Sequence, residues 1–211
     1  MAISDTITSM QNHLKSAYDK VSEKGGTVPS EKNMANLSEA IDSVKYTDFL
    51  LQIVNRTVTE CVDDTFTKLG AHLFKAIYTI TKIDCPNVLE IGTECCEYDY
   101  KLTDINLPKC QVLGISSLRY NDGMTKIDLP SIVKIGTHAF YSNKKFKTLI
   151  IRTPSQVCTL ENTNAFGNTP IATSTTEGFI YVPDDLVDSY KSATNWSTYA
   201  SKIKPISDLG E

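Results

Sequence analysis

Six cysteines are the side chains of this sequence with the widest range of chemistry. A thiolate can bind a metal, form a disulfide or act as a nucleophile. Metal and redox sites commonly use a C-x-x-C spacing, but no two of these cysteines are spaced in that way, and the three histidines follow no ligand pattern. We therefore interpret the cysteines as small buried apolar side chains. They are Cys61, Cys85, Cys95, Cys96, Cys110 and Cys158.

Other signatures of catalysis are also missing from the sequence. We find no nucleophile elbow, no phosphate-binding loop, no zinc-binding spacing and no pair of carboxylates placed for acid–base chemistry. The sequence thus predicts no catalytic, cofactor-binding or metal-binding residue, and a protein that is not an enzyme.

The net charge of the chain limits the classes of partner that it can bind. The 211 residues carry a net charge of −4 and no strongly basic block, which argues against nucleic acid and against an anionic membrane surface. The first residues have neither the basic nor the apolar region of a secretory signal. No apolar run approaches the roughly 18–20 residues of a membrane span. We expect a protein that is made and folded in the host cytoplasm, with no membrane partner.

The elements that must position functional side chains come from an internal repeat. Gly70, Gly92, Gly114 and Gly136 follow one another at intervals of 22 residues, each directly after Leu or Ile. Apolar residues recur at the same offsets in each unit, and a fourth unit gains two residues near its end. Prolines close the first three units at one shared offset, namely Pro86, Pro108 and Pro130.

The 22-residue period predicts a fold in which the repeat units stack on one another. One unit cannot bury its apolar face alone, so successive units must share a continuous core. The alternation of apolar and polar residues before each proline predicts a short strand, and we expect these strands to stack into one sheet. We expect the repeated glycine at a corner with positive φ. Cys85, Cys96 and Cys110 occupy positions held elsewhere by large apolar residues, which makes them core residues.

This pattern resembles the BspA-like leucine-rich repeats, whose unit reads roughly I-G-x-x-A-F and then L-x-x-I-x-L-P. Residues 134–140 and 125–130 match it best, and the resemblance extends over about residues 50–172. The second unit departs from it, because Cys95 and Cys96 replace Ala and Phe, which indicates a looser turn. The resemblance implies a leucine-rich-repeat solenoid.

The end of the chain is expected to close that solenoid. Residues 178–183 predict a final strand, and residues 184–191 predict a helix with acidic residues at its N-terminal end. A solenoid needs a cap at its open end. The segment resembles the C-terminal closing module of such repeats in bacteriophage and Gram-positive bacterial proteins. We interpret Trp196, the single tryptophan, as a buried residue of this cap.

The start of the chain predicts two helices. Residues 3–21 carry apolar side chains at spacings of four and three residues, which is a heptad seam. Gly25 and Gly26 end this helix, and a second amphipathic stretch follows. An intramolecular helical hairpin and an oligomerisation or docking element both fit, and the two can hold together. The candidate docking or oligomer seam is Ile3, Ile7, Met10, Leu14, Ala17 and Val21.

Two sets of exposed residues are candidates for a binding surface. Strand alternation turns one polar set outward, and tyrosines with acidic neighbours (Glu97, Asp99 and Asp122) gather in the variable loops, as on a sugar-binding surface. A solvated sheet face and a variable solenoid edge explain the same residues without a ligand, so both interpretations stay open. The candidates are Asp84, Asn106 and Asp128 on the strands and Tyr78, Tyr98, Tyr100, Tyr120 and Tyr141 in the loops.

The sequence as a whole therefore predicts an α+β protein: a β-rich leucine-rich-repeat solenoid of 22-residue units with an N-terminal helical hairpin and a small α/β C-terminal cap. We expect a helical anchor over 1–45, the solenoid over 46–172 and the cap over 173–211.

Residues 24–41 resemble a short module at the N-termini of phage virion proteins. Together with the repeat and the cap, this implies a non-enzymatic virion structural protein that docks through its N-terminal helices. Its repeats would serve as an adhesin or a decoration, on the tail fibre, the baseplate or the head. The expected partners are other virion proteins, further copies of the chain (a trimer would suit a fibre) and a host-surface glycan or protein. The alternative is a bacterial surface adhesion protein.

Overall fold

The computed structural model describes residues 3–210, except for the side chains of residues 3–10, 38, 42 and 44–48. The chain divides into two compact units, Met1–Asn55 and Arg56–Glu211, called here the helical unit and the repeat unit. The boundary expected at residue 45 lies inside a helix, which continues to Val54 because its apolar pattern runs on through Leu50 and Leu51.

The helical unit is a hairpin of α1 (Ile3–Glu23) and α2 (Met34–Val54). Gly25 ends the first helix in the left-handed region at φ +76°, where glycine has no steric cost. Asn33 begins the second helix as its N-cap, since its side-chain oxygen accepts a hydrogen bond from the backbone N–H of Asn36 at 3.0 Å.

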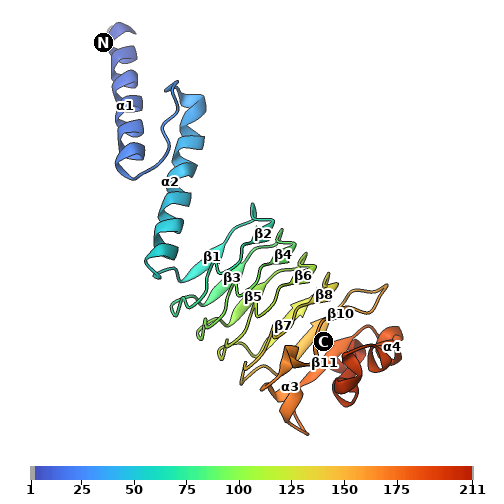
Figure 1. Ribbon diagram of the computed structural model, residues 1–211. Coiled ribbons are helices and arrows are strands. Elements are labelled where there is room, and N and C mark those ends of the chain that lie inside the picture. The colour runs from blue at the N-terminus through green and yellow to red at the C-terminus, as the bar shows by residue number, and fades with distance from the viewer. Residues whose placement is uncertain (1–2, 211) are drawn as a thin grey trace. The chain divides into compact units, whose positions relative to one another are not determined.

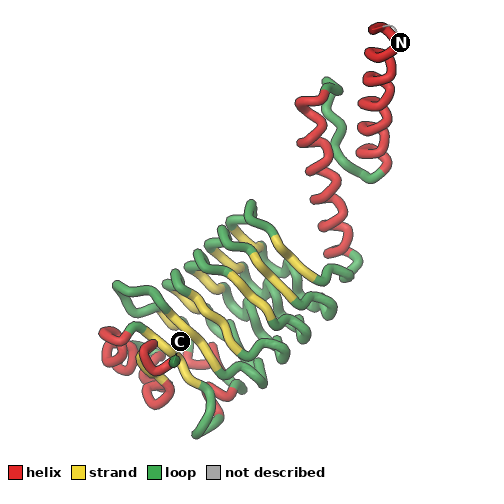
Figure 2. Tube along the Cα trace, turned by 180° about the vertical axis from the view of Figure 1, so that it is seen from behind, coloured by secondary structure: helices red, strands yellow, loops and turns green. Residues whose placement is uncertain are grey.

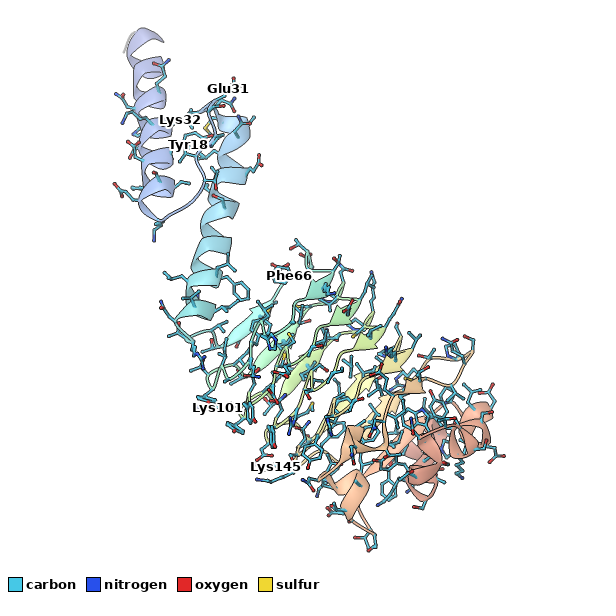
Figure 3. All side chains as sticks on the ribbon, viewed as in Figure 1. Tyr18, Glu31, Lys32, Phe66, Lys101 and Lys145 are labelled. Atoms are coloured by element: carbon cyan, nitrogen blue, oxygen red, sulfur yellow. The ribbon has the colours of Figure 1, made fainter. Side chains whose placement is uncertain are left out.

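The core of the helical unit lies between the two helices. Tyr18, Val21 and Ala40 are buried there, and Leu14 and Leu37 pack against them. Figure 3 shows Tyr18 between α1 and α2, where its hydroxyl donates to the carbonyl of Asn33 at 2.7 Å. This bond ties the first helix to the start of the second.

The predicted seam is therefore divided. Val21 and Leu14 pack on α2 within the chain, because the hairpin brings an apolar face of α2 against them. Ala17 is half-buried. The side chains of Ile3, Ile7 and Met10 lie outside the described residues. In the described part, Leu14 and Val21 of the seam pack within the hairpin.

The repeat unit consists of short parallel strands in three sheets within the described residues. Figures 1 and 2 show the strands side by side, joined by loops. One sheet holds β1 (Glu60–Val62), β3 (Lys82–Asp84) and β5 (Asp104–Asn106). A second holds β7 (Lys126–Leu129), β9 (Thr148–Ile151), β11 (Phe179–Val182) and β12 (Ile203–Pro205). The third holds β2 (Lys68–Leu69), β4 (Glu90–Ile91), β6 (Val112–Leu113), β8 (Lys134–Ile135) and β10 (Thr159–Leu160).

Paired residues lie one repeat apart along the chain. Lys82 pairs with Asp104, and Lys126 pairs with Thr148. The third sheet follows the same offset, as in the pairing of Leu69 with Ile91, although it was not expected from the sequence. Its two-residue strands lie directly before each repeated glycine, at positions where the sequence predicted only a corner.

The single sheet expected before the prolines is interrupted between β5 and β7. Just before the paired strands of neighbouring units, a backbone N–H donates to the carbonyl of the equivalent residue 22 positions earlier. Within the described chain, no such bond reaches the carbonyl of Thr103, which precedes β5. The expectation of one continuous sheet was therefore wrong. The bonds at the intact junctions join Thr81 N to Thr59 O at 2.8 Å, Thr103 N to Thr81 O at 3.0 Å and Lys147 N to Thr125 O at 2.8 Å.

The repeated glycines are not at positive φ, which corrects the expectation for these positions. Their role is close approach between backbones. A Cβ built on Gly136 would lie 2.7 Å from the carbonyl carbon of Gly114, and one on Gly114 would lie 2.8 Å from that of Gly92. Gly70 has open space around it, because no earlier repeat stacks on it. Corners at positive φ are instead formed by residues with side chains, such as Tyr98 and Tyr120.

Large apolar side chains form the core of the repeat unit. Phe140 stacks on Phe146 at 4.8 Å between ring centroids and on Phe166 at 5.5 Å. All six cysteines are buried and free, as expected from their positions in the repeat. Burial raises the pKa of Cys110 and of Cys158 to about 12, so these thiols stay protonated and unreactive at neutral pH.

A buried polar column also runs through the core, with members one repeat apart. The side-chain oxygen of Asn143 accepts from the N–H of Asn121 at 2.6 Å, and that of Asn121 accepts from the N–H of Asp99 at 2.8 Å. Asp99 in turn accepts from the N–H of Ile77 at 2.8 Å. The amide groups of both asparagines also donate to backbone carbonyls, at 2.9 Å each. The column thereby satisfies turn backbone groups that burial would otherwise leave without partners.

The C-terminal part mixes strands with short helices. Trp196 is buried as expected, and its indole N–H donates to the carbonyl of Cys158 at 2.6 Å. Tyr190 packs edge-on against Trp196, and its hydroxyl oxygen accepts a hydrogen bond from the backbone N–H of Cys158 at 2.9 Å. The helices are η1 (Thr163–Phe166), α3 (Pro170–Thr173), η2 (Asp184–Leu186), α4 (Val187–Ser192), η3 (Trp196–Lys202) and η4 (Ile206–Leu209).

Arg56–Glu211 forms one compact unit, so the boundary expected at residue 172 stays a prediction within it. None of the helices in the described part of the chain combines the length and the apolarity needed to cross a bilayer.

Candidate binding surface

The polar residues predicted on the strands mainly bind one another. The side-chain N–H of Asn106 donates to Asp84 at 2.8 Å, and Asp128 pairs with the Nε of Arg152 at 2.8 Å. The break between β5 and β7 separates Asn106 from Asp128. The three residues therefore do not form one continuous row, and within the described chain Oδ1 of Asp128 is buried without a hydrogen-bond partner.

The predicted tyrosines do come together, and we call Tyr78, Tyr98, Tyr100, Tyr120 and Tyr141 the tyrosine row. Tyr98 and Tyr120 stack with ring centroids 4.6 Å apart and planes 7° apart, and Tyr78 stacks on Tyr100 at 5.7 Å. Edge-to-face contacts at 6.2 Å link Tyr98 to Tyr100 and Tyr120 to Tyr141. The row thus presents adjoining aromatic faces along one edge of the repeat unit.

The backbone of the loops aims these rings. Tyr98 and Tyr120 have φ values of +69° and +60°, a region that residues with a side chain rarely occupy. Each is held there by the next repeat, since the N–H of Tyr98 donates to the carbonyl of Arg119 and that of Tyr120 to the carbonyl of Tyr141, both at 3.0 Å. Ala76 and Ser142 have the same left-handed backbone one repeat to either side, so this corner belongs to the repeat turn.

The outer part of the row is accessible. Tyr78 is 53% exposed and Tyr100 is 45% exposed, whereas the other three tyrosines are half-buried. Exposed aromatic rings of this size are unusual on a protein surface unless they bind something. Lys101 and Lys145, labelled in Figure 3, are exposed in the loops of the same unit.

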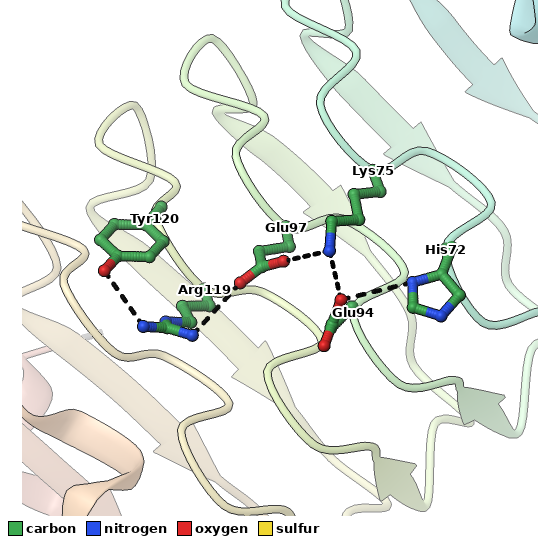
Figure 4. A network of polar contacts seen from close by, with 6 residues as sticks. All are labelled: His72, Lys75, Glu94, Glu97, Arg119 and Tyr120. Atoms are coloured by element: carbon green, nitrogen blue, oxygen red, sulfur yellow. Dashed lines mark hydrogen bonds and ion pairs between the residues drawn. The ribbon is translucent and has the colours of Figure 1, made fainter.

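A network of charged side chains reaches the row at Tyr120 (Figure 4). Glu97 is 3% exposed and pairs with Lys75 at 2.8 Å and with Arg119 at 3.4 Å. Lys75 also bonds Glu94, which contacts His72 at 3.4 Å. The hydrogen bond from Lys75 lowers the pKa of Glu94, so this carboxylate stays charged at neutral pH.

Arg119 connects the network to the rings. Its guanidinium carbon lies 4.5 Å from the ring centroid of Tyr120 and 5.1 Å from that of Tyr141. It also donates to the hydroxyl of Tyr120 at 3.1 Å. A cation held over two aromatic faces restricts both rings, and Glu97 holds the cation in turn. Arg119 therefore holds the inner two rings of the row, Tyr120 and Tyr141, in place.

Two of the acidic neighbours expected beside the tyrosines are not on the surface. Glu97 belongs to the buried network, and Asp99 belongs to the buried column, because the repeat turns both side chains inward. Burial raises the pKa of Asp99 to about 8. Asp122 is half-exposed and lies 3.5 Å from Lys144. The surface of the row is therefore less acidic than the sequence suggested.

Sequence reasoning missed Arg119 and Lys75. A signal was available, because residues 75, 97, 119 and 141 share one position of the repeat and read Lys, Glu, Arg and Tyr in order. Alternating charge at a shared position predicts ion pairs between neighbouring repeats. Within the described residues, no three histidine, cysteine or acidic side chains gather closely enough to hold a metal ion.

Comparison with known proteins identifies the repeat. The family model for the BspA type leucine rich repeat region, with six copies, matches residues 55–172 and 111–201. A crystal structure of a leucine-rich repeat protein from Bacteroides ovatus is similar at 17% sequence identity and a TM-score of 0.47. The match covers 71% of this chain and 42% of that protein, so this chain spans less than half of its length. No curated protein is significantly similar to the sequence.

Proposed function

The chain belongs to the BspA type leucine-rich repeat family, and we propose that it is a non-catalytic structural protein that binds a surface ligand through its tyrosine row. The observation that carries this proposal is the set of stacked rings at the exposed edge, held from behind by Arg119 and Glu97. Ordered aromatic faces supply contact area at low entropic cost.

A lack of catalysis and of any cofactor is part of the proposal. It is supported by the way the ionisable groups of this edge are used. Glu97 is committed to two cations, and Lys75 to two carboxylates. Groups neutralised in such pairs are poorly placed to move a proton or attack a substrate, because their partners hold them in one charge state.

We also propose that the repeats form a solenoid of 22-residue units. The register supports this, since Glu60 pairs with Lys82 and Lys82 pairs with Asp104, each 22 positions further along. Later pairings have longer offsets, as in Phe179 with Thr148, so the period loosens toward the cap. Such a stack offers one edge built from equivalent loops, on which an extended ligand can lie.

Docking is proposed to use the helical unit. Leu14 and Val21 are occupied within the hairpin, so the better candidates are apolar side chains that α2 leaves exposed, among them Leu50, Leu51 and Val54. Exposed apolar side chains of this size favour a partner. The partner would be another virion protein or further copies of this chain, with the trimer as one form of the homo-oligomer.

The assignment to a bacteriophage virion rests on the sequence resemblance of the two ends of the chain to phage modules. Membership of the repeat family is equally compatible with a bacterial surface adhesion protein, which is the second candidate. In both cases the tyrosine row would face a host-surface glycan or protein. Gold-labelled electron microscopy with an antibody to the cap would separate the two: label on particles supports the virion, and label confined to cell surfaces supports the adhesion protein.

The binding proposal is tested with the labelled full chain on a panel of Gram-positive and Gram-negative bacterial cells. We expect the double variant Tyr78→Ala, Tyr100→Ala to bind cells at least about tenfold more weakly than the unaltered chain, which corresponds to about 1.4 kcal/mol. Tyr181→Ala is the matched control, since Tyr181 is a partly exposed tyrosine on β11 outside the row. Equal binding by all three proteins would show that the row is not the binding surface.

A further inference from the structure

A pocket of about 460 Å³ opens in the C-terminal part of the repeat unit, among η1, α3 and η3. Small-molecule sites typically have volumes of roughly 300–1,000 Å³, so this cap pocket has the size of a binding site. The polar network of the tyrosine row does not include it, and the sequence analysis did not single it out.

Hydroxyl groups dominate the lining of the cap pocket. Those of Thr173 and Ser174 are used within their own loop, where Thr173 donates to the carbonyl of Thr169 at 2.9 Å and Ser174 accepts from the N–H of Glu177 at 2.9 Å. Within the described chain no bond is found for the other four threonine and serine hydroxyls of the lining, so they are free to donate and to accept. They belong to Thr163, Thr175, Thr198 and Ser201.

The charge of the lining limits the ligand. None of the described residues around the cap pocket carries a carboxylate, and Lys202 is its one cationic side chain. The ammonium group of Lys202 donates to the carbonyl of Glu177 at 2.7 Å and lies 5.4 Å from the ring centroid of Phe179, outside the lining. The pocket therefore offers no anion, and its one cation is largely buried and bonded to a backbone carbonyl, which favours an uncharged ligand.

One wall of the cap pocket is apolar and fixed. Tyr199 is nearly buried, with its ring edge-on to Phe166 at 5.2 Å and its hydroxyl bonded to the carbonyl of Thr163. Ala172 lines the pocket with an exposed methyl group. A pyranose ring has an apolar C–H face and a rim of hydroxyls, so it matches a wall that is apolar at Ala172 and bordered by hydroxyl side chains.

The cap pocket adjoins the tyrosine row. Gly167 lines the pocket, and a Cβ at that position would lie 2.7 Å from ring carbons Cδ2 and Cε2 of Tyr141. The next residue, Asn168, donates to the hydroxyl of Tyr141 at 3.0 Å. The last ring of the row therefore lies against a residue that lines the pocket, and glycine at position 167 leaves room for that contact.

We propose that the cap pocket binds one neutral pyranose of a saccharide whose remaining units lie along the tyrosine row. This proposal rests on the proposed function of the row and gives its ligand a chemical class. The pocket selects the residue through free hydroxyls and the apolar wall at Ala172, and the row adds contact area through ring faces. No bond is made or broken.

The test uses saturation-transfer nuclear magnetic resonance on the full chain. The probes are the methyl glycosides of glucose, galactose, mannose and N-acetylglucosamine at millimolar concentration, with methyl glucuronide as the anionic comparison. Ala172→Trp fills the cap pocket from an exposed position, and Thr176→Trp adds the same ring to an exposed neighbour that does not line it. We expect at least one neutral glycoside to bind, Ala172→Trp to weaken it at least about tenfold, and Thr176→Trp to leave it unchanged.

Three results would overturn the pocket proposal. They are binding that Ala172→Trp does not affect, preference for the glucuronide, and the absence of any transfer to the neutral glycosides. The variant Tyr78→Ala, Tyr100→Ala separates this proposal from the function of the row. If it retains binding of the single glycoside but loses binding to cells, both stand. If cell binding depends on the row while Ala172→Trp has no effect on the glycoside, the row stands and the pocket assignment falls.

Discussion

The helical unit and the repeat unit bury their side chains by different means. In the helical unit, one face of each helix meets the other, and the described core is small, with Tyr18, Val21 and Ala40 at its centre. In the repeat unit, equivalent residues such as Leu69, Leu113 and Ile135 stack in columns and are completely excluded from solvent. A helix buries a stripe and leaves a stripe outside, whereas a stack of repeats closes its core on all sides except its ends.

This contrast explains where the exposed features lie. The helical unit leaves large apolar side chains exposed, as at Met34 and Val54. The repeat unit exposes single aliphatic side chains, Val62, Leu89 and Ile115, and two large rings, Tyr78 and Tyr100, that stack on each other. The difference is that the exposed rings of the repeat unit are held against each other.

The largest effect is expected from opening a cavity in the stacked core. Phe140→Ala removes a ring that stacks on Phe146 and Phe166 and should cost about 3–5 kcal/mol of unfolding free energy. Urea unfolding followed by the fluorescence of Trp196, the single tryptophan, reports on the repeat unit alone. Helical circular dichroism from the other unit should persist at urea concentrations where this signal is lost. A cost below about 1 kcal/mol would mean that the columns can rearrange as freely as a helical hairpin.

A smaller and pH-dependent effect is expected in the buried polar column. Asp99 has a pKa of about 8 because of its burial, against about 3.9 for an unfolded aspartate. The folded state therefore holds the proton more tightly between these values, and stability should fall as pH rises from about 4 to about 8 and then level off. Within the described residues, Oδ2 of Asp99 is buried without a partner, where Asn121 and Asn143 place a donating amide.

Asp99→Asn should accordingly remove this dependence. We expect the gain to be smallest near pH 4 and to grow with pH to several kcal/mol, on the order of 5 kcal/mol, above pH 8, measured by urea unfolding at both pH values. Asn121→Asp is the matched control, since it adds a second buried carboxyl to the same column and should deepen the fall. If Asp99→Asn is no more stable than the unaltered chain at high pH, the charged carboxylate of Asp99 is stabilised by a partner outside this column.

The smallest effect is expected in the helical unit. Tyr18→Phe keeps the buried ring but removes the hydroxyl that bonds the carbonyl of Asn33. The expected loss is about 0.5–1.5 kcal/mol, visible in thermal melting of the helical signal and not in the fluorescence of Trp196. Tyr181→Phe in the repeat unit serves as the control. An equal change in both signals would mean that the two units unfold together, and the comparison between them would have to be abandoned.

The sequence predicted the elements better than their contacts. The heptad spacing of residues 3–21 indicated a helix correctly, but it could not say whether the apolar face meets α2 or another chain. The spacing of apolar residues shows that one face of a helix is buried, but it does not show which element covers that face. The turn of glycines 25 and 26 made the hairpin possible, and only the packing of Val21 on the second helix decided for it.

The glycines and the tyrosines illustrate the same limit. Spacing marked Gly114 and Gly136 as special, but the reason is the approach of neighbouring backbones, which exists only once the repeats are stacked. Spacing also collected the tyrosines into one set of loops. Tyr98 stacks on Tyr120, with Arg119 over the ring of Tyr120, because both tyrosines have positive φ. The residue types at these positions do not predict that backbone conformation.

The sequence by itself determined the family, the repeat, the buried cysteines and the strands before each proline, because periodic burial of apolar side chains leaves a periodic pattern in the residues. Only the tertiary structure decided which polar groups face inward, as for Glu97 and Asp99, where the sheet is interrupted, and that Tyr141 lies against a residue that lines the cap pocket. Those outcomes depend on distances between residues far apart in the chain, and such distances are set by packing rather than by local order.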